Sequence, residues 1–441
     1  MKKLVYISLA VVLLFIACSD NDKDEPEVSV SVPTEASYTL SNSPRLPHKS
    51  TKRGLCYDFK NHEVADMKLV GNSISWFYNW GAATNKTLAQ ASAEYGIEFS
   101  PMCWNGSYNP TTIVNTAELY GNCQYLLAFN EPNLTDQANM TPQQAATLWP
   151  TLLQTAHDNN LKIVSPAMNY GTLSGYGDPE VWLDEFFSLI DASDIAAISV
   201  HCYMPSVAAL KSYIEKFEKY GKPIWLTEFC AWDGFSGSAE EQMQYMSEAI
   251  NYLEASPIVE RYAWFIARTS NANAFPYMSL LTDNQTTNVG SAYLAASTQD
   301  TTVYAIEGQQ IEAERFVRCN ASDVIGSHGQ YSATVHYRPT TDAKGNLDVY
   351  HFGIGQWLEY QIEVENDGEY DIQLRCNPMV KTILHISIDG ADDGEAEVSK
   401  TNAWSTTHYI TELCAGKHTL RLTVQSGNTA MNYIVFEPMD N

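Results

Sequence analysis

The spacing of apolar residues along the chain changes near Ser297. Before that point, short runs rich in apolar and β-branched residues alternate with stretches that have the apolar spacing of a helix. Eight strand-like runs are found at 53–57, 73–80, 98–104, 125–130, 162–168, 196–203, 223–229 and 261–266. Eight strand–helix repeats in about 250 residues predict an α/β fold, a (β/α)8 TIM barrel, over residues 51–297. A doubly wound sheet is the alternative, but repeats of about 30 residues favour a closed barrel.

Helix signals lie between these runs. Thr141 and Gln144 have the spacing of a capping box, and Pro142 between them suits the first helical turn. Pro150 lies further along the same helical pattern and is expected to kink or divide the helix. Further helices are expected over 207–220 and 239–255.

From residue 302 onward, strand patterns follow one another without a convincing helix. Over 357–364, apolar and polar residues alternate, so that Leu358, Tyr360, Ile362 and Val364 share one face. Turns such as Asp367-Gly368 and Asp389-Gly390 separate the runs. The pattern predicts an all-β sandwich of the jelly-roll type over 302–441.

The N-terminus has the features of an export signal. Lys2 and Lys3 precede an apolar run that ends at Ala17-Cys18 and is shorter than the roughly 20 residues of a membrane span. It predicts a lipoprotein signal peptide over 1–17 with acylation of Cys18; an ordinary signal peptide with an incidental cysteine is the alternative. Residues 18–50 are expected to form an acidic, polar tether. Its first part, residues 19–25, resembles a bacterial export signal for outer membrane lipoproteins exposed at the cell surface.

The amino-acid composition of the chain excludes some classes of binding partner. The net charge of −26 argues against nucleic acid and anionic membranes, whose binding needs basic patches. The 10 Trp and 26 Tyr include many beside Asn, Gly and Pro, and exposed aromatic rings suit sugars. The cysteines after Cys18 lack metal-ligand spacing, so structural zinc is not expected, and any disulfide pairing stays open.

Two glutamates end strand-like runs, where the active sites of (β/α)8 barrels gather. Glu131 follows the fourth run and Glu228 lies in the seventh. Glycoside hydrolysis needs one carboxyl group that gives a proton and one that stays ionised, about 5–5.5 Å apart when configuration is retained. His201 and Tyr203 end the sixth run and supply hydrogen-bond donors near Glu228. The pair predicts a glycoside hydrolase that needs no cofactor for catalysis.

These motifs resemble clan A of the glycoside hydrolases, through Asn130-Glu131-Pro132, His201-Cys202-Tyr203 and Thr227-Glu228-Phe229. More narrowly, the barrel resembles glycoside hydrolase family 128. The similar segments are Trp76-Phe77-Tyr78-Asn79-Trp80, Ser100-Pro101-Met102-Cys103-Trp104, Phe129-Asn130-Glu131-Pro132-Asn133, Val164-Ser165-Pro166-Ala167, Ile224-Trp225-Leu226-Thr227-Glu228-Phe229 and Tyr262-Ala263-Trp264-Phe265.

The resemblance implies a retaining endo-β-1,3-glucanase with Glu131 as acid/base and Glu228 as nucleophile. It also implies that Asn130 binds the sugar 2-hydroxyl and that Tyr203 orients Glu228. Candidate substrate-binding residues are His201, Trp76, Trp80, Trp104, Trp232 and Trp264. About half of the candidate tryptophans are expected to touch substrate, Trp104 and Trp264 foremost, and the others to pack the barrel. A core histidine is the alternative for His201.

The second domain resembles carbohydrate-binding module family 6. The similar segments are Ile311-Glu312-Ala313-Glu314, residues 350–360, residues 416–422 and Asn432-Tyr433-Ile434-Val435-Phe436. The resemblance implies that Tyr350 and Trp404 sandwich a sugar beside Asn432, although residues 352–356 lack the family's acids. It also implies a structural calcium ion at Glu312 and Glu314, since calcium prefers oxygen ligands; ordinary strand glutamates are the alternative.

Two other functions stay open. One is a non-catalytic surface glycan-binding lipoprotein, which the presence of both carboxylates disfavours. The other is a β-glycanase of different linkage specificity. In each case the expected partners are a polysaccharide, such as β-glucan, and the outer membrane through a lipid anchor, and the protein is expected to be a monomer.

Overall fold

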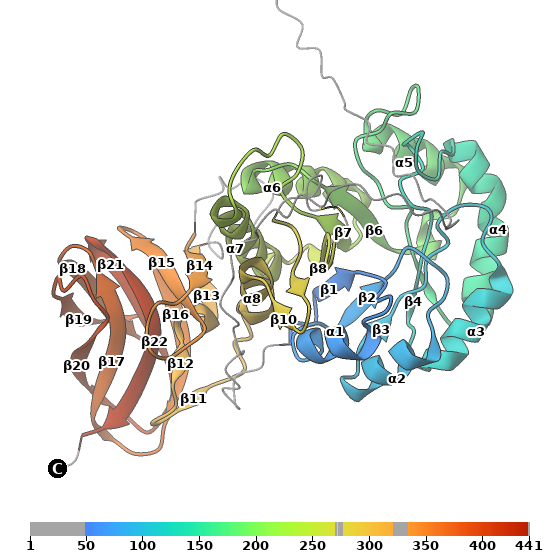
Figure 1. The fold of residues 1–441 in the computed structure, drawn as a ribbon. Coiled ribbons are helices and arrows are strands. Elements are labelled where there is room, and N and C mark those ends of the chain that lie inside the picture. The colour runs from blue at the N-terminus through green and yellow to red at the C-terminus, as the bar shows by residue number, and fades with distance from the viewer. Residues whose placement is uncertain (1–48, 270, 272–276, 321–333, 440–441) are drawn as a thin grey trace, which may run out of the picture.

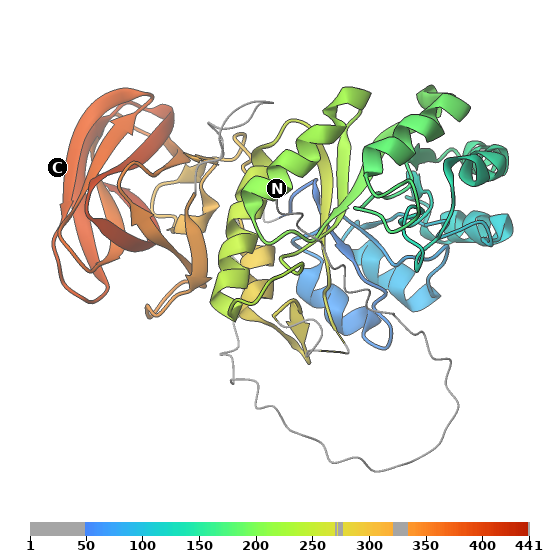
Figure 2. The ribbon, with the colours of Figure 1, turned by 90° about the horizontal axis from the view of Figure 1, so that it is seen from above.

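The computed structural model describes residues 49–269, 271, 277–320 and 334–439. The predicted signal peptide, Cys18 and nearly all of the tether lie outside these residues. The described chain forms an α/β barrel followed by a separate all-β unit, which lie side by side in Figures 1 and 2. Among the described helices, none is long and apolar enough to cross a membrane.

All eight predicted barrel strands are present, in a parallel sheet of order β3-β2-β1-β8-β7-β6-β5-β4. A parallel bridge between Met102 and Leu127 joins the segment after β3 to β4 and so closes the sheet. The strands are β1 (Arg53–Cys56), β2 (Trp76–Tyr78), β3 (Glu98–Phe99), β4 (Tyr125–Leu127), β5 (Lys162–Val164), β6 (Ile195–Cys202), β7 (Ile224–Phe229) and β8 (Val259–Trp264).

Helices surround this sheet (Figure 2). They are α1 (Glu63–Val70), α2 (Lys86–Glu94), α3 (Pro110–Tyr120), α4 (Pro142–Asp158), α5 (Pro179–Leu189), α6 (Val207–Glu215), α7 (Ala239–Ala255) and α8 (Asn288–Ala295), with 3-10 turns η1 (Ala192–Asp194) and η2 (Lys216–Tyr220). A small hairpin, β9 (Leu281–Thr282) and β10 (Gln285–Thr286), precedes α8.

Helix α4 begins as predicted and continues further than predicted. Thr141 and Gln144 form the capping box, and Pro142 lies in the first turn. Pro150 does not divide the helix, which runs through to Asp158. Trp149 and Leu152 on either side of Pro150 are buried, so packing against the barrel holds the helix together where one backbone donor is missing.

The barrel interior is aromatic. Arg261 places its guanidinium over the rings of Trp76, Tyr125 and Trp225, at 4.4–5.4 Å from the centroids. Its charge is paired with Glu98, 2.6 Å away. The interior below the active site is therefore a packed core.

The second domain contains two sheets built mainly of antiparallel strands, as the alternating pattern predicted. One has the order β11-β16-β21-β18-β19 with β13 beside β16, and the other β14-β15-β22-β17-β20 with β12 beside β22. Leu358, Tyr360, Ile362 and Val364 all point into the core between them. The elements are β11 (Ala305–Ile306), β12 (Ile311–Glu312), η3 (Ala313–Arg315), β13 (Arg318–Cys319), β14 (His336–Pro339), β15 (Leu347–Gly353), β16 (Trp357–Val364), β17 (Gly368–Pro378), β18 (Thr382–Ile388), β19 (Ala391–Val398), β20 (Ser405–Leu413), β21 (Gly416–Ser426) and β22 (Asn428–Pro438).

The two domains meet where α7 packs against β14 and β15. Asn251 of α7 donates to the carbonyl of Val335 at 3.3 Å and accepts a hydrogen bond from the Tyr337 hydroxyl. Gln244, two turns earlier, donates to the hydroxyl of Tyr350 at 3.0 Å. Asn251 and Tyr337 are buried, so the sandwich is attached by specific polar contacts in addition to the connecting segment.

Candidate active site

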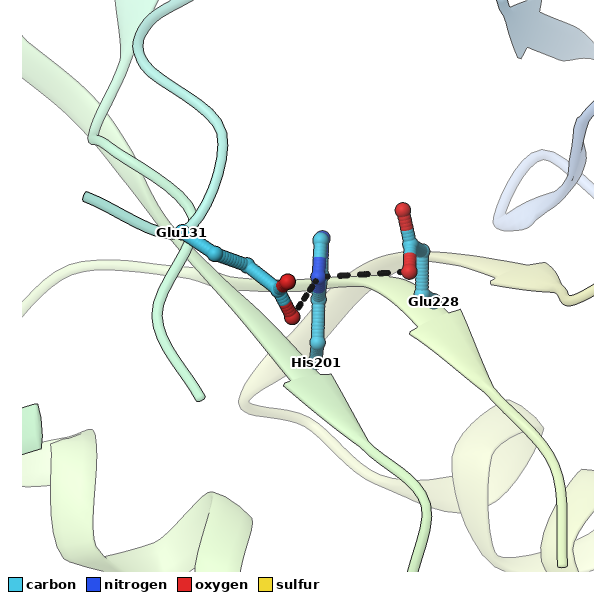
Figure 3. A group of neighbouring side chains, drawn as sticks. All are labelled: Glu131, His201 and Glu228. Carbon is cyan, nitrogen blue, oxygen red and sulfur yellow. Dashed lines mark hydrogen bonds and ion pairs between the residues drawn. The ribbon is translucent and has the colours of Figure 1, made fainter. Parts of the chain in front are cut away.

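Glu131 and Glu228 lie together at the carboxyl ends of the barrel strands, with His201 between them (Figure 3). Glu131 follows β4, His201 is in β6 and Glu228 is in β7, directly opposite His201 in register. Nδ1 of His201 lies 2.9 Å from Oε1 of Glu131 and 3.3 Å from Oε2 of Glu228. Carboxylate oxygens of the two glutamates lie within 4.8 Å of each other. Two residues that are almost 100 positions apart thus form one buried pair.

Glu228 is held by donors on both of its oxygens. Oε1 accepts from the Tyr78 hydroxyl at 2.9 Å and from the Trp80 indole nitrogen at 2.6 Å. Oε2 accepts from the Tyr203 hydroxyl, which is the contact expected of a residue that orients Glu228. With His201 near Oε2, the carboxyl group has almost no freedom to rotate.

The electrostatics of the pair reflect burial and the short distances. Burial raises the pKa of Glu228, the charge of Glu131 adds to the rise, and His201, Trp80 and Tyr203 oppose it. Burial alone lowers the pKa of His201, but the charges of Glu228 and Glu131 outweigh burial and leave that pKa raised. His201 therefore holds a second proton more readily than a free imidazole does.

Glu131 is fixed through one oxygen. Oε1 accepts from Nδ2 of Asn169 at 3.1 Å and lies 2.9 Å from Nδ1 of His201. Because Nδ1 also faces Oε2 of Glu228, we assign the tautomer that carries a proton on Nδ1, which makes His201 a second donor to Oε1. The backbone of Glu131 has φ of 44°, in the left-handed region that a non-glycine residue rarely adopts. Its amide donates to the carbonyl of Ala167 at 3.0 Å, which holds this strained turn in place.

Sequence reasoning missed Tyr78, Asn169 and Gln137. Tyr78 lies two positions before Trp80, and both donate to Glu228. Asn169 is the first polar residue after the 162–168 run, so the rule that selected Glu131 would also have selected it. Gln137 accepts from Nδ2 of Asn130 at 3.1 Å, and no signal in the sequence marks it.

The prediction that Trp76 and Trp264 bind sugar is wrong. Trp76 is fully buried in the barrel core and donates to the carbonyl of Lys52, at the opposite end of β1 from the active site. Trp264 is also fully buried and donates to the carbonyl of Met278 at 2.8 Å, so it offers no face to a sugar. Trp76 lies deep in the barrel, at the start of β2 and on the same strand face as Tyr78, whereas Trp264 packs against Tyr245 of α7 and Tyr293 of α8.

The other candidate sugar-binding tryptophans follow the carboxyl ends of their strands. Trp80, Trp104 and Trp232 are half-buried, and Trp232 stacks over Phe265 at 6.4 Å. Asn130 is buried, and within the described chain its Oδ1 accepts no hydrogen bond. That oxygen is available to a hydroxyl donor from substrate.

This arrangement agrees with comparisons to known proteins. Residues 54–293 match the model of the glycosyl hydrolase catalytic core family. The chain belongs to this family. A family 128 (subgroup II) endo-β-1,3-glucanase from Pseudomonas viridiflava is 38% identical, with a TM-score of 0.51, over 56% of this chain and 98% of that one. The family 128 (subgroup II) endo-β-1,3-glucanase from Sorangium cellulosum is 31% identical, with a TM-score of 0.49, over 55% and 98% of the respective chains.

One curated relative is longer. The alkali-sensitive linkage protein 1 of Schizosaccharomyces pombe is 29% identical over 229 residues, which are 50% of this chain and 39% of that protein. Residues 327–438 match carbohydrate binding module family 6. The glycosyl hydrolase core is therefore followed by a family 6 module, as the motifs predicted.

The expected sugar cleft of this module is not formed as predicted. Tyr350 is only 2% exposed and is hydrogen-bonded to α7 of the glycosyl hydrolase core. Asn432 is fully buried and donates to Asp342 and to the carbonyl of Lys344. Trp404 is half-buried and donates to Thr341 at 2.9 Å, so it alone of the three retains an accessible surface.

Proposed function

We propose that the protein is a retaining endo-β-1,3-glucanase with Glu131 as acid/base and Glu228 as nucleophile. The observation that carries this proposal is the approach of their carboxylate oxygens to within 4.8 Å. An inverting enzyme needs roughly 6.5–9.5 Å between its carboxyls to admit a water, whereas a retaining one needs only about 5–5.5 Å.

The roles follow from the contacts. Glu228 is surrounded by donors from Tyr78, Trp80, Tyr203 and His201, which favour an ionised carboxylate able to attack the anomeric carbon. Glu131 is bound through Oε1, which leaves its other oxygen for a proton that passes to the glycosidic oxygen. The choice of β-1,3-glucan and of endo action rests on the Pseudomonas viridiflava enzyme, which is similar over 98% of its length.

The test is release of reducing sugar from laminarin, curdlan, mixed-linkage glucan and cellulose, with product sizes followed over time. We expect soluble oligosaccharides of several lengths from the β-1,3-glucans and none from cellulose. Release of one small product from the first time point would contradict endo action. Activity on cellulose alone would contradict the linkage.

The protein is proposed to act as an outer membrane lipoprotein at the cell surface, anchored through Cys18. This proposal rests on the apolar run that ends at Ala17-Cys18 and on the acidic residues that follow. Metabolic labelling with a fatty acid should mark the wild type and not Cys18→Ala. Protease treatment of intact cells should remove the labelled protein if it faces outward.

The family 6 module is proposed to bind polysaccharide through Trp404, the accessible member of the predicted trio. Trp404→Ala should weaken co-sedimentation with insoluble β-1,3-glucan and leave hydrolysis of short oligosaccharides unchanged, because a module acts by raising local substrate concentration. Unchanged co-sedimentation would exclude Trp404 as the contact.

A structural calcium ion is proposed beside Glu312 and Glu314. Both are buried, and burial together with Glu312 and Asp348 raises the pKa of Glu314 well above its usual range. Within the described residues, Oε2 of Glu314 accepts no hydrogen bond, so this oxygen and Glu312 suit a hard cation. Removing calcium with a chelator should lower the melting temperature and adding calcium should restore it; an unchanged melting temperature would exclude the ion.

A further inference from the structure

Asn169 occupies a position that neither the motifs nor the family resemblance assigned. It follows the predicted run 162–168, which begins with β5, and its side chain is half-buried. Nδ2 lies 3.1 Å from Oε1 of Glu131, while Oδ1 accepts from the backbone amide of Tyr170 at 2.8 Å. Because Oδ1 is engaged by an amide that can only donate, the orientation of the Asn169 side chain is determined and its NH2 group faces Glu131.

The backbone of Asn169 is held by a separate residue. Asn133, fully buried in the loop after Glu131, donates from Nδ2 to the carbonyl of Asn169 at 2.7 Å. The carbonyl of Asn133 accepts from the amides of Thr172 and Leu173 at 3.0 and 2.9 Å. Gly171 lets the two loops come this close, since a Cβ there would lie 2.5 Å from atoms of Asn133. The loops after β4 and β5 therefore form one unit that carries both Glu131 and Asn169.

The consequence for Glu131 concerns its two oxygens. Oε1 receives two donors, Nδ1 of His201 and Nδ2 of Asn169. A proton on Oε1 would be repelled by the hydrogens of these two donors. Within the described residues, Oε2 receives no hydrogen bond. Asn169 and His201 together thus direct the acidic proton to Oε2.

We propose that Asn169 is a positioning residue for the acid/base, which fixes the Glu131 carboxyl so that Oε2 carries the proton given to the leaving group. In the glycosylation step, the bond between C1 and the glycosidic oxygen breaks as a Glu228 oxygen bonds to C1. The proton on Oε2 passes to the departing oxygen, and Glu131 becomes a carboxylate whose Oε1 is already bound by two donors. This inference rests on the proposed acid/base role of Glu131.

The experiment compares two substrates that differ in their need for a proton. Laminaritriose has a sugar leaving group that must be protonated, whereas 2,4-dinitrophenyl β-laminaribioside releases 2,4-dinitrophenolate, which is stable as an anion and needs no proton. In Asn169→Ala, kcat/KM for laminaritriose should fall about tenfold or more, part of the roughly 10²–10⁴-fold that general acid–base catalysis supplies. The loss on the aryl substrate should be less than about twofold, with KM for both substrates little changed.

Two further variants separate positioning from folding. Asn169→Asp keeps the acceptor for the Tyr170 amide but turns an oxygen toward Glu131, so the loss on laminaritriose should equal or exceed that of Asn169→Ala. Asn115→Ala, at an exposed position of α3, removes the same side chain away from the loop pair and should behave as wild type on both substrates. Equal losses on the two substrates in both Asn169 variants would show a merely structural role and overturn the inference.

Glu131→Ala, measured in parallel, distinguishes this inference from the proposed function. If Glu131→Ala shows no dependence on leaving group, the assignment of Glu131 as acid/base fails. If Glu131→Ala shows that dependence while Asn169→Ala keeps wild-type rates on laminaritriose, the acid/base assignment stands and the role of Asn169 is overturned.

Discussion

His201 and Glu228 face each other across β6 and β7 as register partners, with Nδ1 of the histidine 3.3 Å from Oε2 of the glutamate. The contact adds to the donors already on Glu228 and places the imidazole between the two carboxyls. A carboxylate held in this way has a defined orientation for attack on a bound sugar. A loss of activity when this carboxylate is replaced by an amide can therefore be attributed to the loss of the nucleophile.

Glu228→Gln should reduce kcat by at least about 10³-fold while the protein stays folded and binds laminarin, because an amide cannot act as the nucleophile. Reducing-sugar release and affinity electrophoresis measure the two properties. Glu118→Gln, on the exposed side of α3, is the matched control and should keep full activity. Substantial turnover by Glu228→Gln would remove Glu228 from this role.

The first product of hydrolysis should keep the β configuration, since the gap of at most 4.8 Å between carboxylate oxygens leaves no place for an attacking water. Proton NMR of the anomeric region, recorded in the first minutes before mutarotation, decides this. An α-anomer appearing first would show inversion.

Trp76 and Trp80 should respond differently to substitution although they lie on the same strand segment. Trp76→Ala removes a fully buried ring and should lower the free energy of unfolding by about 3–5 kcal/mol. Trp80→Phe removes the indole donor to Glu228 and should lower kcat with little change in stability. Chemical denaturation and kinetics on laminarin check both, and loss of substrate binding in a folded Trp76 variant would contradict the buried position.

The contact between the domains should be measurable through Tyr337. Tyr337→Phe leaves the buried Oδ1 of Asn251 without its donor and should cost about 1–3 kcal/mol of unfolding free energy. Tyr433→Phe, on a half-buried ring of β22, is the control and should change stability by less than about 0.5 kcal/mol. Equal stability of the two variants would indicate that the domains are held mainly by other contacts.

Asp342 should make stability depend on pH. Its hydrogen bonds from Arg375 and Asn432 lower the pKa of the carboxyl to about 2 from its usual 3.8, so the folded state favours the ionised form. This contribution is fully present above about pH 5 and is lost as pH falls toward 2. Asp342→Asn should therefore be less stable than wild type by about 1–2 kcal/mol at pH 7, after allowance for solvent screening, with a smaller difference at pH 2.5. Urea unfolding at the two pH values measures it, and a difference independent of pH would contradict the assignment.

The strands, the domain order and the proposed catalytic pair could all be predicted from the amino-acid sequence. Strand alternation and helix caps are local, so the eight barrel runs and the cap at Thr141 follow from neighbours in the chain. Glu131 and Glu228 could be selected because strand ends in a barrel converge on one rim whatever the details of packing. The resemblance to family 128 then implied a role for each glutamate.

The side chains that surround the two glutamates could not be predicted, because they depend on how distant segments pack. Trp76 lies at the start of β2, deeper in the barrel than Trp80, and Trp264 packs against Tyr245 of α7 and Tyr293 of α8, so both rings are in the core. Tyr350 is covered by α7, a contact between segments about 100 residues apart that no local pattern specifies. Asn169 reaches Glu131 because Asn133 joins two loops. Such contacts depend on how separate elements pack, and packing is set by the whole chain at once.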